Sequence, residues 1–587
     1  MTALDRLSAD AIAADVRSRR RSAADVMDEV IERLAFYDTI QPAIWISRLD
    51  AAALRAAAVA VDERVARGKT LPLAGVPFAV KDNIDVIGLD TTAACPAFAY
   101  APARSATVIE HLVAAGAIPV GKTNLDQFAT GLNGTRSPYG IPRNAYNRAW
   151  VSGGSSSGSA VAVGAGLVAF SLGTDTAGSG RIPAAFNHLI GFKPTRGRWS
   201  SRGLVPACRT LDCITVFAGT AGDAGLVDDV VAGFDREDGF SRTLDDAPRA
   251  RHRIGIPRAD QRPWFGNIES EFLYATALTS LDAELVEIDM APLNEAARLL
   301  YNGPWVAERT AALQDLLRDD PEAIHPVVRT IVEQGQAYSA VETFEARYRL
   351  ADLARIAEAM WADVDLLALP TAPTSYRVAE MLAAPIALNA NLGAYTNFVN
   401  LLDMAAIAVP TGRYRNGVGF GVTLMGPAAS DRSLIEAAKA LFPAPAPPPP
   451  LDLEGRMETV KLAVVGAHLK DMPLHWQLTS RDARFVGEAK TAPAYRLYAM
   501  ADSVPPKPAL VHSGADNGGG APIALEIYEL DMAAFGSFVA DVPPPLAIGT
   551  VTLEDGSLVK GFVAEPRAMT GAEDITALGG WRAYVAR

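Results

Sequence analysis

Residues 153–184 read GGSSSGSAVAVGAGLVAFSLGTDTAGSGRIPA, and this stretch predicts the fold. Glycine and serine gather at both ends, and the apolar run 160–170 joins them. Small residues let a ligand approach the backbone closely, and successive N–H groups in such loops can bind an anion. Because the apolar run would anchor both loops, we expect two glycine-rich loops on a buried core. A glycine- and serine-rich surface linker is the alternative interpretation.

Helical patterns alternate with short apolar strands on both sides of this stretch. Ser22 and Asp25 form an approximate capping box, and apolar residues follow it at helical spacing. A second amphipathic segment around Val108 and Leu112 ends at Gly116, and the strand-like run 117–120 comes next. This alternation predicts an α/β fold with a mainly parallel or mixed sheet.

A run of prolines divides the chain. Residues 443–450 read PAPAPPPP, which cannot continue a helix or a sheet and favours an extended spacer. We therefore expect a large body at 1–442, a linker at 443–454 and a small module at 455–587. Strand-like runs at 462–465, 524–530 and 559–563 predict that the module is a β-rich α+β domain.

The composition excludes some functions. The 587 residues carry a net charge of −13, which repels phosphate backbones and argues against a nucleic-acid partner. No apolar run is long enough to span a membrane and no signal-like segment opens the chain, so we expect a cytoplasmic protein without a membrane segment. The three cysteines, Cys95, Cys208 and Cys213, do not suggest a disulfide framework or a metal site.

The two loops favour serine chemistry over phosphate binding. Neither loop contains GxxxxGK[ST] or GxGxxG. A nucleophilic serine needs a base, but no histidine of the body has a Ser/His/Asp context. A lysine can replace histidine when desolvation makes it neutral. Lys81 ends the apolar run 76–80 and suits this role, although a lysine after a strand is more often a surface residue.

The 153–184 stretch and the segment PFAVKDNID around Lys81 resemble the amidase signature family. The resemblance implies that Ser179 is the nucleophile, that Ser155 is a bridging serine after a cis bond to Gly154, and that Lys81 is the base. It also implies an oxyanion hole from the N–H groups of Thr176, Ala177, Gly178 and Ser179, with no metal or cofactor. We expect Asp175 to hold the loop by hydrogen bonds rather than to react.

Other segments are similar to allophanate hydrolases within that family. They are TTAACPAFAY (91–100), GTRSPYG (134–140), VPACRTLDC (205–213), LLYNGPWVAER (299–309) and YTNFVNLLDM (395–404). The resemblance implies that Tyr301 and Arg309 bind the substrate, and an arginine fork suits a carboxylate. From the residues alone, Arg309 would be assigned to an ion pair on the surface of a helix.

Two segments of the module, VVGAHL (464–469) and 543–562, resemble the C-terminal domain of long allophanate hydrolases. That domain is similar to γ-glutamylcyclotransferase folds. The resemblance implies that the module assists the decarboxylation of N-carboxycarbamate. His468 is our candidate residue for this role, and His475 is the second choice. A structural histidine and a role in assembly alone are the alternatives.

The resemblance implies hydrolysis of allophanate in urea catabolism by a homodimer, with urea carboxylase or another enzyme of nitrogen metabolism as a partner. Three other functions stay open. They are an amidase of other small amides, the amidase-like subunit of a tRNA-dependent amidotransferase, and a binding module without activity.

Overall fold

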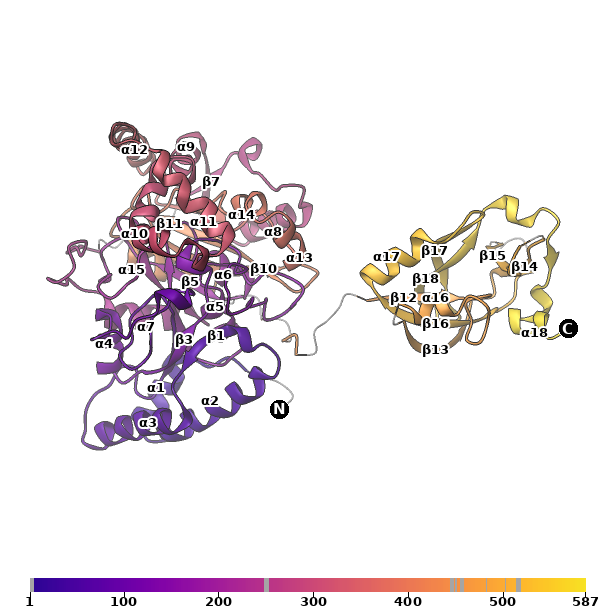
Figure 1. Cartoon of the computed structure of the whole chain (residues 1–587), viewed down its shortest axis with the longest axis horizontal. Coiled ribbons are helices and arrows are strands. Elements are labelled where there is room, and N and C mark those ends of the chain that lie inside the picture. Colours follow the sequence, from indigo (N-terminus) through magenta and orange to yellow (C-terminus); the bar gives the residue numbers. More distant parts are fainter. Residues whose placement is uncertain are drawn as a thin grey trace. The chain divides into compact units, whose positions relative to one another are not determined.

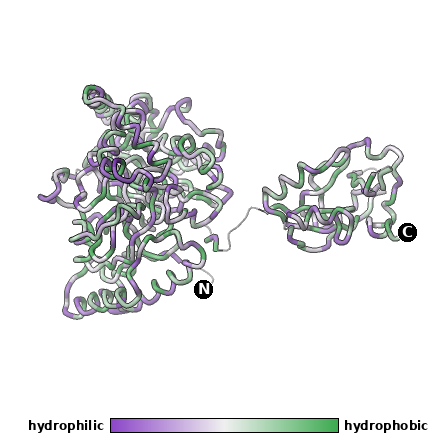
Figure 2. Tube along the Cα trace, viewed as in Figure 1, coloured by the Kyte–Doolittle hydropathy of each residue, from purple (hydrophilic) through white to green (hydrophobic). Residues whose placement is uncertain are grey.

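The computed structural model describes residues 5–246, 253–443, 448, 451–453, 459–481, 483–501, 503–513 and 519–587. The chain divides into two compact units, Met1–Gly455 and Arg456–Arg587. Each unit has its own hydrophobic core. Hydrophobic and hydrophilic stretches alternate along the chain of both units (Figure 2). No helix of the described residues is long and apolar enough to cross a membrane.

A mixed sheet of eleven strands, counted over the described residues, runs through the first unit (Figure 1). In spatial order the strands are β1 (Trp45–Arg48), β3 (Ile118–Thr123), β2 (Pro77–Lys81), β4 (Phe170–Asp175), β6 (Cys213–Ala218), β5 (Ile190–Lys193), β10 (Ala405–Arg413), β11 (Gly419–Gly426), β9 (Leu366–Pro370), β7 (Arg253–Pro257) and β8 (Glu284–Ile288). Strand β2 is parallel to both β3 and β4, while β6 is antiparallel to β4. The predicted α/β fold with a mixed sheet is confirmed.

Helices surround this sheet. They are α1 (Ala9–Arg17), α2 (Ala23–Asp38), α3 (Ala51–Ala66), α4 (Thr107–Ala114), α5 (Ser157–Gly164), α6 (Ile182–Phe186), α7 (Ala221–Val231), α8 (Ile268–Thr279), α9 (Ala291–Tyr301), α10 (Trp305–Asp319), α11 (Pro326–Glu333), α12 (Ala340–Met360), α13 (Val378–Ala383), α14 (Ala387–Leu392) and α15 (Asp431–Leu441). The predicted capping box before α2 is present, since Ser22 and Asp25 each accept the other's backbone N–H. It fixes the start of a helix whose apolar face is buried.

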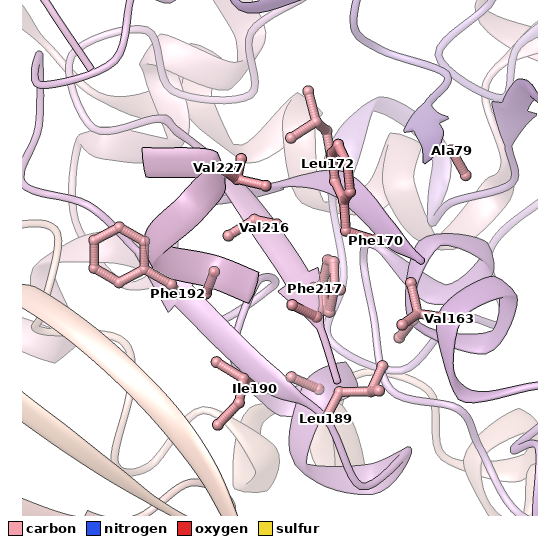
Figure 3. Close-up of a cluster of buried hydrophobic side chains, with 14 of the residues drawn as sticks. Ala79, Val163, Phe170, Leu172, Leu189, Ile190, Phe192, Val216, Phe217 and Val227 are labelled. Atoms are coloured by element: carbon pink, nitrogen blue, oxygen red, sulfur yellow. The ribbon is translucent and has the colours of Figure 1, made fainter. Parts of the chain in front are cut away.

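Helix α5 and strand β4 lie in the middle of the core. Every residue of both elements is buried. Figure 3 shows Val163 of α5 near Phe170 and Leu172 of β4, among apolar side chains of neighbouring strands. The Phe170 ring stacks on that of Phe78 with centroids 5.1 Å apart. Since α5 and β4 hold the two glycine-rich loops on the core, the surface-linker interpretation is wrong.

The second unit contains two smaller sheets. The five-stranded sheet has the order β13 (Arg484–Lys490), β16 (Ala524–Asp531), β12 (Thr459–Val464), β18 (Leu558–Ala564) and β17 (Leu546–Thr552), and the three-stranded sheet is β15 (Pro508–His512), β14 (Tyr495–Ala499) and β19 (Glu573–Asp574). The helices are α16 (Trp476–Thr479), α17 (Met532–Ala540) and α18 (Trp581–Val585). The β-rich α+β fold and the three predicted strand runs are confirmed.

The end of the expected linker belongs to the first unit. Asp452 is buried, its carboxylate accepts the Arg148 N–H at 2.8 Å, and its own N–H donates to the Ala145 carbonyl at 3.0 Å. Leu451 and Leu453 pack against the core of the same unit. Most residues of the proline run itself lie outside the described residues.

Candidate active site

One hydroxyl ties the two glycine-rich loops together. Ser156 Oγ accepts the Thr174 N–H at 3.2 Å and donates to the Thr174 carbonyl at 3.1 Å. A side chain at Gly173 would collide with the Ser156 hydroxyl. The small residues of both loops are therefore needed for the loops to touch.

Lys81 ends β2 beneath these loops and is fully buried. Its Nζ donates to Ser155 Oγ at 2.7 Å and to Thr174 Oγ1 at 2.6 Å. Burial lowers the pKa of Lys81 to about 7, although the negative charges of Asp126, Asp212 and Asp175 act in the opposite direction. A substantial fraction of the amine is therefore neutral near pH 7 and can accept a proton.

Asp126 fixes the backbone around Ser155. The Asp126 N–H donates to the Ser155 carbonyl at 3.0 Å, and its carboxylate accepts the N–H groups of Gly134 at 3.0 Å and Arg136 at 2.9 Å. A side chain at Gly154 would overlap the Asp126 carboxylate. The expected cis bond between Gly154 and Ser155 is present.

Ser179 is buried, and its hydroxyl donates to the Gly131 carbonyl at 3.3 Å. Among the described residues, no hydrogen bond joins Ser179 Oγ to Ser155 Oγ. The structure thus brings Lys81 and Ser155 into direct contact and places Ser179 on the facing loop with a different partner. Sequence reasoning missed Gly131 and Thr174, because neither a backbone carbonyl nor a strand threonine carries a distinctive signal.

Asp175 organises the loop that carries Ser179. Its carboxylate accepts the Gly178 N–H at 2.9 Å and the Gly180 N–H at 3.0 Å, and it pairs with both Arg181 Nε and Nη2. Burial alone would raise the pKa of Asp175, but the Arg181 guanidinium outweighs it and holds the pKa below its usual range. The expectation that Asp175 holds the loop by hydrogen bonds is confirmed.

These bonds change the set of available oxyanion donors. The Gly178 N–H is occupied by Asp175, which corrects the expectation that it points to a ligand. The N–H groups of Thr176, Ala177 and Ser179 donate to no acceptor within the part of the chain that the structure describes. The Thr176 hydroxyl donates to Asp212, whose pKa burial raises to about 6.

Tyr301 and Arg309 lie together next to the Ser179 loop. Arg309 Nη1 donates to Thr130 Oγ1 at 3.0 Å, and its guanidinium carbon lies 5.2 Å from the centroid of the Tyr301 ring. Arg309 is 1% exposed, and the adjacent Glu308 instead accepts hydrogen bonds from Thr210. The surface ion-pair interpretation of Arg309 is therefore wrong. Tyr301 lines a cavity of about 440 Å³.

In the second unit His468 is largely buried between aromatic rings. Its ring stacks on Phe562 with centroids 5.0 Å apart, contacts Phe538, and has Nε2 at 2.8 Å from Gln477 Oε1. Burial lowers the pKa of His468. This environment is that of a packed core residue.

His475 belongs to a polar cluster instead. The Tyr528 hydroxyl lies 3.1 Å from His475 Nε2 and 3.0 Å from Glu526 Oε2. Arg582 donates to the other Glu526 oxygen at 2.6 Å. Glu526 and Arg582 also line a cavity of about 470 Å³. Sequence reasoning missed this cluster, apart from His475, because three separate segments supply it.

The described residues contain no group of histidine, cysteine, aspartate and glutamate side chains suited to a metal ion.

Comparisons with known proteins agree on both units. Residues 28–435 match the family described as Amidase, and residues 460–586 match the Allophanate hydrolase C-terminal domain. A urea amidolyase from Lachancea kluyveri is 44% identical over 92% of this chain, but the chain spans only 31% of that relative. A solved structure of Kluyveromyces lactis allophanate hydrolase has a TM-score of 0.67 and 40% identity, covering 96% of this chain and 99% of that one. A glutamyl-tRNA(Gln) amidotransferase subunit from Chloroflexus aurantiacus is 34% identical over 75% of this chain and 97% of the relative.

Replacing Asp175 by Asn should destabilise the first unit strongly. The change leaves the buried Arg181 without a counter-charge, which costs about 3–5 kcal/mol. Denaturant unfolding measures the change. Asp15→Asn is the control, because it removes one partner of an exposed pair with Arg20 and should leave the unfolding free energy unchanged. Equal stability of the two variants would contradict the role given to Asp175.

Proposed function

The chain belongs to the amidase family and carries an allophanate hydrolase C-terminal domain, and from this premise we propose that it hydrolyses allophanate, the carboxylate of urea, to ammonia and N-carboxycarbamate. The contact between buried Lys81 and Ser155 is the observation that carries the proposal. It places a base of suitable pKa next to a hydroxyl that can relay a proton.

The first half of the reaction forms an acyl-enzyme. Ser179 Oγ turns from the Gly131 carbonyl toward Ser155 and attacks the amide carbon, and catalytic hydrogen bonds often close only when substrate is bound. The Ser179 proton moves to Ser155 Oγ while the Ser155 proton moves to Lys81. The carbonyl oxygen becomes an oxyanion, which the free N–H groups of Thr176 and Ala177 would stabilise.

The second half releases the products. The carbon–nitrogen bond breaks, and the proton on Lys81 returns through Ser155 to the leaving nitrogen, so ammonia departs. Water then attacks the acyl carbon by the same relay, frees Ser179 and leaves N-carboxycarbamate. Arg309 would hold the substrate carboxylate, and Tyr301 would position the guanidinium by stacking on it.

In the second unit we place the proposed assistance to decarboxylation on the cluster of His475, Tyr528 and Glu526. The support is that the Tyr528 hydroxyl hydrogen-bonds to both His475 and Glu526, and that Glu526 lines a cavity. A histidine side chain can hold or donate a proton to an acidic intermediate near neutral pH. His468 remains the second candidate, packed between two phenylalanine rings.

We propose that the protein is a homodimer in the cytoplasm. We also propose that it works beside a urea carboxylase, because the matching region is 31% of a longer urea amidolyase. Sedimentation velocity would measure the oligomeric state. The amidotransferase alternative is disfavoured. The match to the glutamyl-tRNA(Gln) amidotransferase subunit covers only 75% of this chain, whereas residues 460–586 match the allophanate hydrolase C-terminal domain.

The purified chain should release ammonia from allophanate, and Ser179→Ala should abolish this. Arg309→Ala should lower kcat/KM for allophanate by about 100-fold, since a buried charge partner is lost, while uncharged malonamide is affected far less. Arg318→Ala, on the exposed side of the same helix, is the control. Equal losses for both substrates would argue for a general amidase.

The rate should depend on pH through Lys81. Protonated Lys81 cannot accept a proton, so kcat/KM should fall as the pH drops through about 7 and level off above it. A pH profile of ammonia release measures this, with malonamide as a substrate whose own charge does not change. A profile without an inflection near neutrality would exclude Lys81 as the base.

Removing the second unit should separate ammonia release from carbon dioxide release. The cut is best made after Leu453, because Asp452 belongs to the first unit. The shortened chain should release ammonia at the full rate but carbon dioxide only at the spontaneous rate. His475→Ala in the whole chain should do the same, whereas His468→Ala should mainly lower stability. Undiminished carbon dioxide release from the shortened chain would contradict a catalytic role.

A further inference from the structure

Thr130 links two buried arginines beside the nucleophile loop. Its hydroxyl accepts Arg309 Nη1 at 3.0 Å, and its carbonyl accepts Arg136 Nη1 at 2.8 Å. The next residue is Gly131, whose carbonyl accepts the Ser179 hydroxyl. Both guanidinium groups therefore lie close to the reacting serine.

Neither arginine forms a direct ion pair with a carboxylate of the described residues. The charge of Asp126 acts on Arg136, and those of Asp212 and Glu308 act on Arg309, from beyond ion-pair distance. Among the described residues, no ion pair within 4.0 Å includes Arg136 or Arg309, and the Nε atom of each is buried without a hydrogen-bond partner. Arg136 is 1% exposed, and its second Nη donates only to the Pro385 carbonyl. Burying a cation without a directly paired carboxylate is unfavourable. An anion that enters the site would offset this cost.

The cavity gives such an anion a place. Arg136 and Tyr301 both line the space of about 440 Å³, together with Asn389 and Asn397. Burial lowers the pKa of Arg136, the charge of Asp126 raises it, and the charge of Arg309 lowers it by a smaller amount, so the two cations repel one another. A ligand with a carboxylate relieves this repulsion, whereas a neutral amide cannot.

We propose that Arg136 is a second specificity-determining residue that, with Arg309, makes the site select amides carrying a carboxylate. The inference rests on the proposed allophanate chemistry. In that chemistry a second negative charge develops on the oxyanion during attack and becomes a second carboxylate after hydrolysis. Two cations therefore match the charge of the product better than Arg309 alone.

The test measures binding rather than turnover, in a Ser179→Ala background. The ligands are malonamate, the monoamide of malonate, and malonamide, its uncharged diamide. They differ by one charge, and both replace the central nitrogen of the substrate with carbon. Arg136→Gln should lower the affinity for malonamate by about 10- to 100-fold, the value of a hydrogen bond to a charged group, and malonamide affinity by less than about threefold. Isothermal titration calorimetry measures both affinities.

Two further variants sharpen the test. Arg136→Lys keeps the charge without the planar fork, so it should lower malonamate affinity severalfold and leave malonamide affinity unchanged. Arg318→Gln removes an exposed arginine of α10, the helix that carries Arg309, and should change neither affinity.

Three outcomes would contradict the proposals. Two of them concern the role of Arg136, and the third concerns the proposed substrate class. If Arg136→Gln or Arg136→Lys weakens both ligands equally, or weakens neither, the inference about Arg136 is wrong. If Arg318→Gln has the same selective effect as Arg136→Gln, long-range charge explains the preference instead. If the Ser179→Ala parent itself does not prefer malonamate to malonamide, the proposed substrate class fails rather than the role of Arg136.

Discussion

The burial of the Lys81 amine is the constraint on which the first unit depends. An amine held away from water at the end of a strand favours its neutral form, and its protons need acceptors. Ser155 and Thr174 supply these acceptors, one from each glycine-rich loop. The loops must therefore meet above β2, and this meeting requires residues as small as Gly154 and Gly173.

Local patterns allowed much of the fold to be predicted. The capping box before α2 and the apolar face that follows depend on residues a few positions apart. The two loops were expected on the core because the run between them is apolar, and the structure buries all of α5 and β4. Lys81 could be singled out for a similar reason, since the strand before it is continuously apolar.

Contacts between distant residues could not be predicted in this way. Arg309 looks like a surface residue in its helix, and only its contact with Thr130, 179 positions away, shows that it lies inside. The assignment of the Gly178 N–H to Asp175 depends on the path of the loop rather than on its composition. The polar cluster around Tyr528 is assembled from α18, β16 and the segment before α16, so no single stretch of sequence reveals it.

The carboxylates that hold the loops also set the strength of the base. Backbone N–H groups of residues 134 and 136 fix Asp126, and those of the Ser179 loop fix Asp175. Asp212 is fixed by Thr176 and by two N–H groups of its own turn. All three raise the pKa of Lys81 against the larger effect of burial. Burial without these charges would lower the pKa of Lys81 further, and the charges without burial would leave the amine protonated near neutral pH. The same bonds that position Ser155 and Ser179 thus keep the pKa of Lys81 near 7, so the loops cannot be rearranged without changing the chemistry of the lysine beneath them.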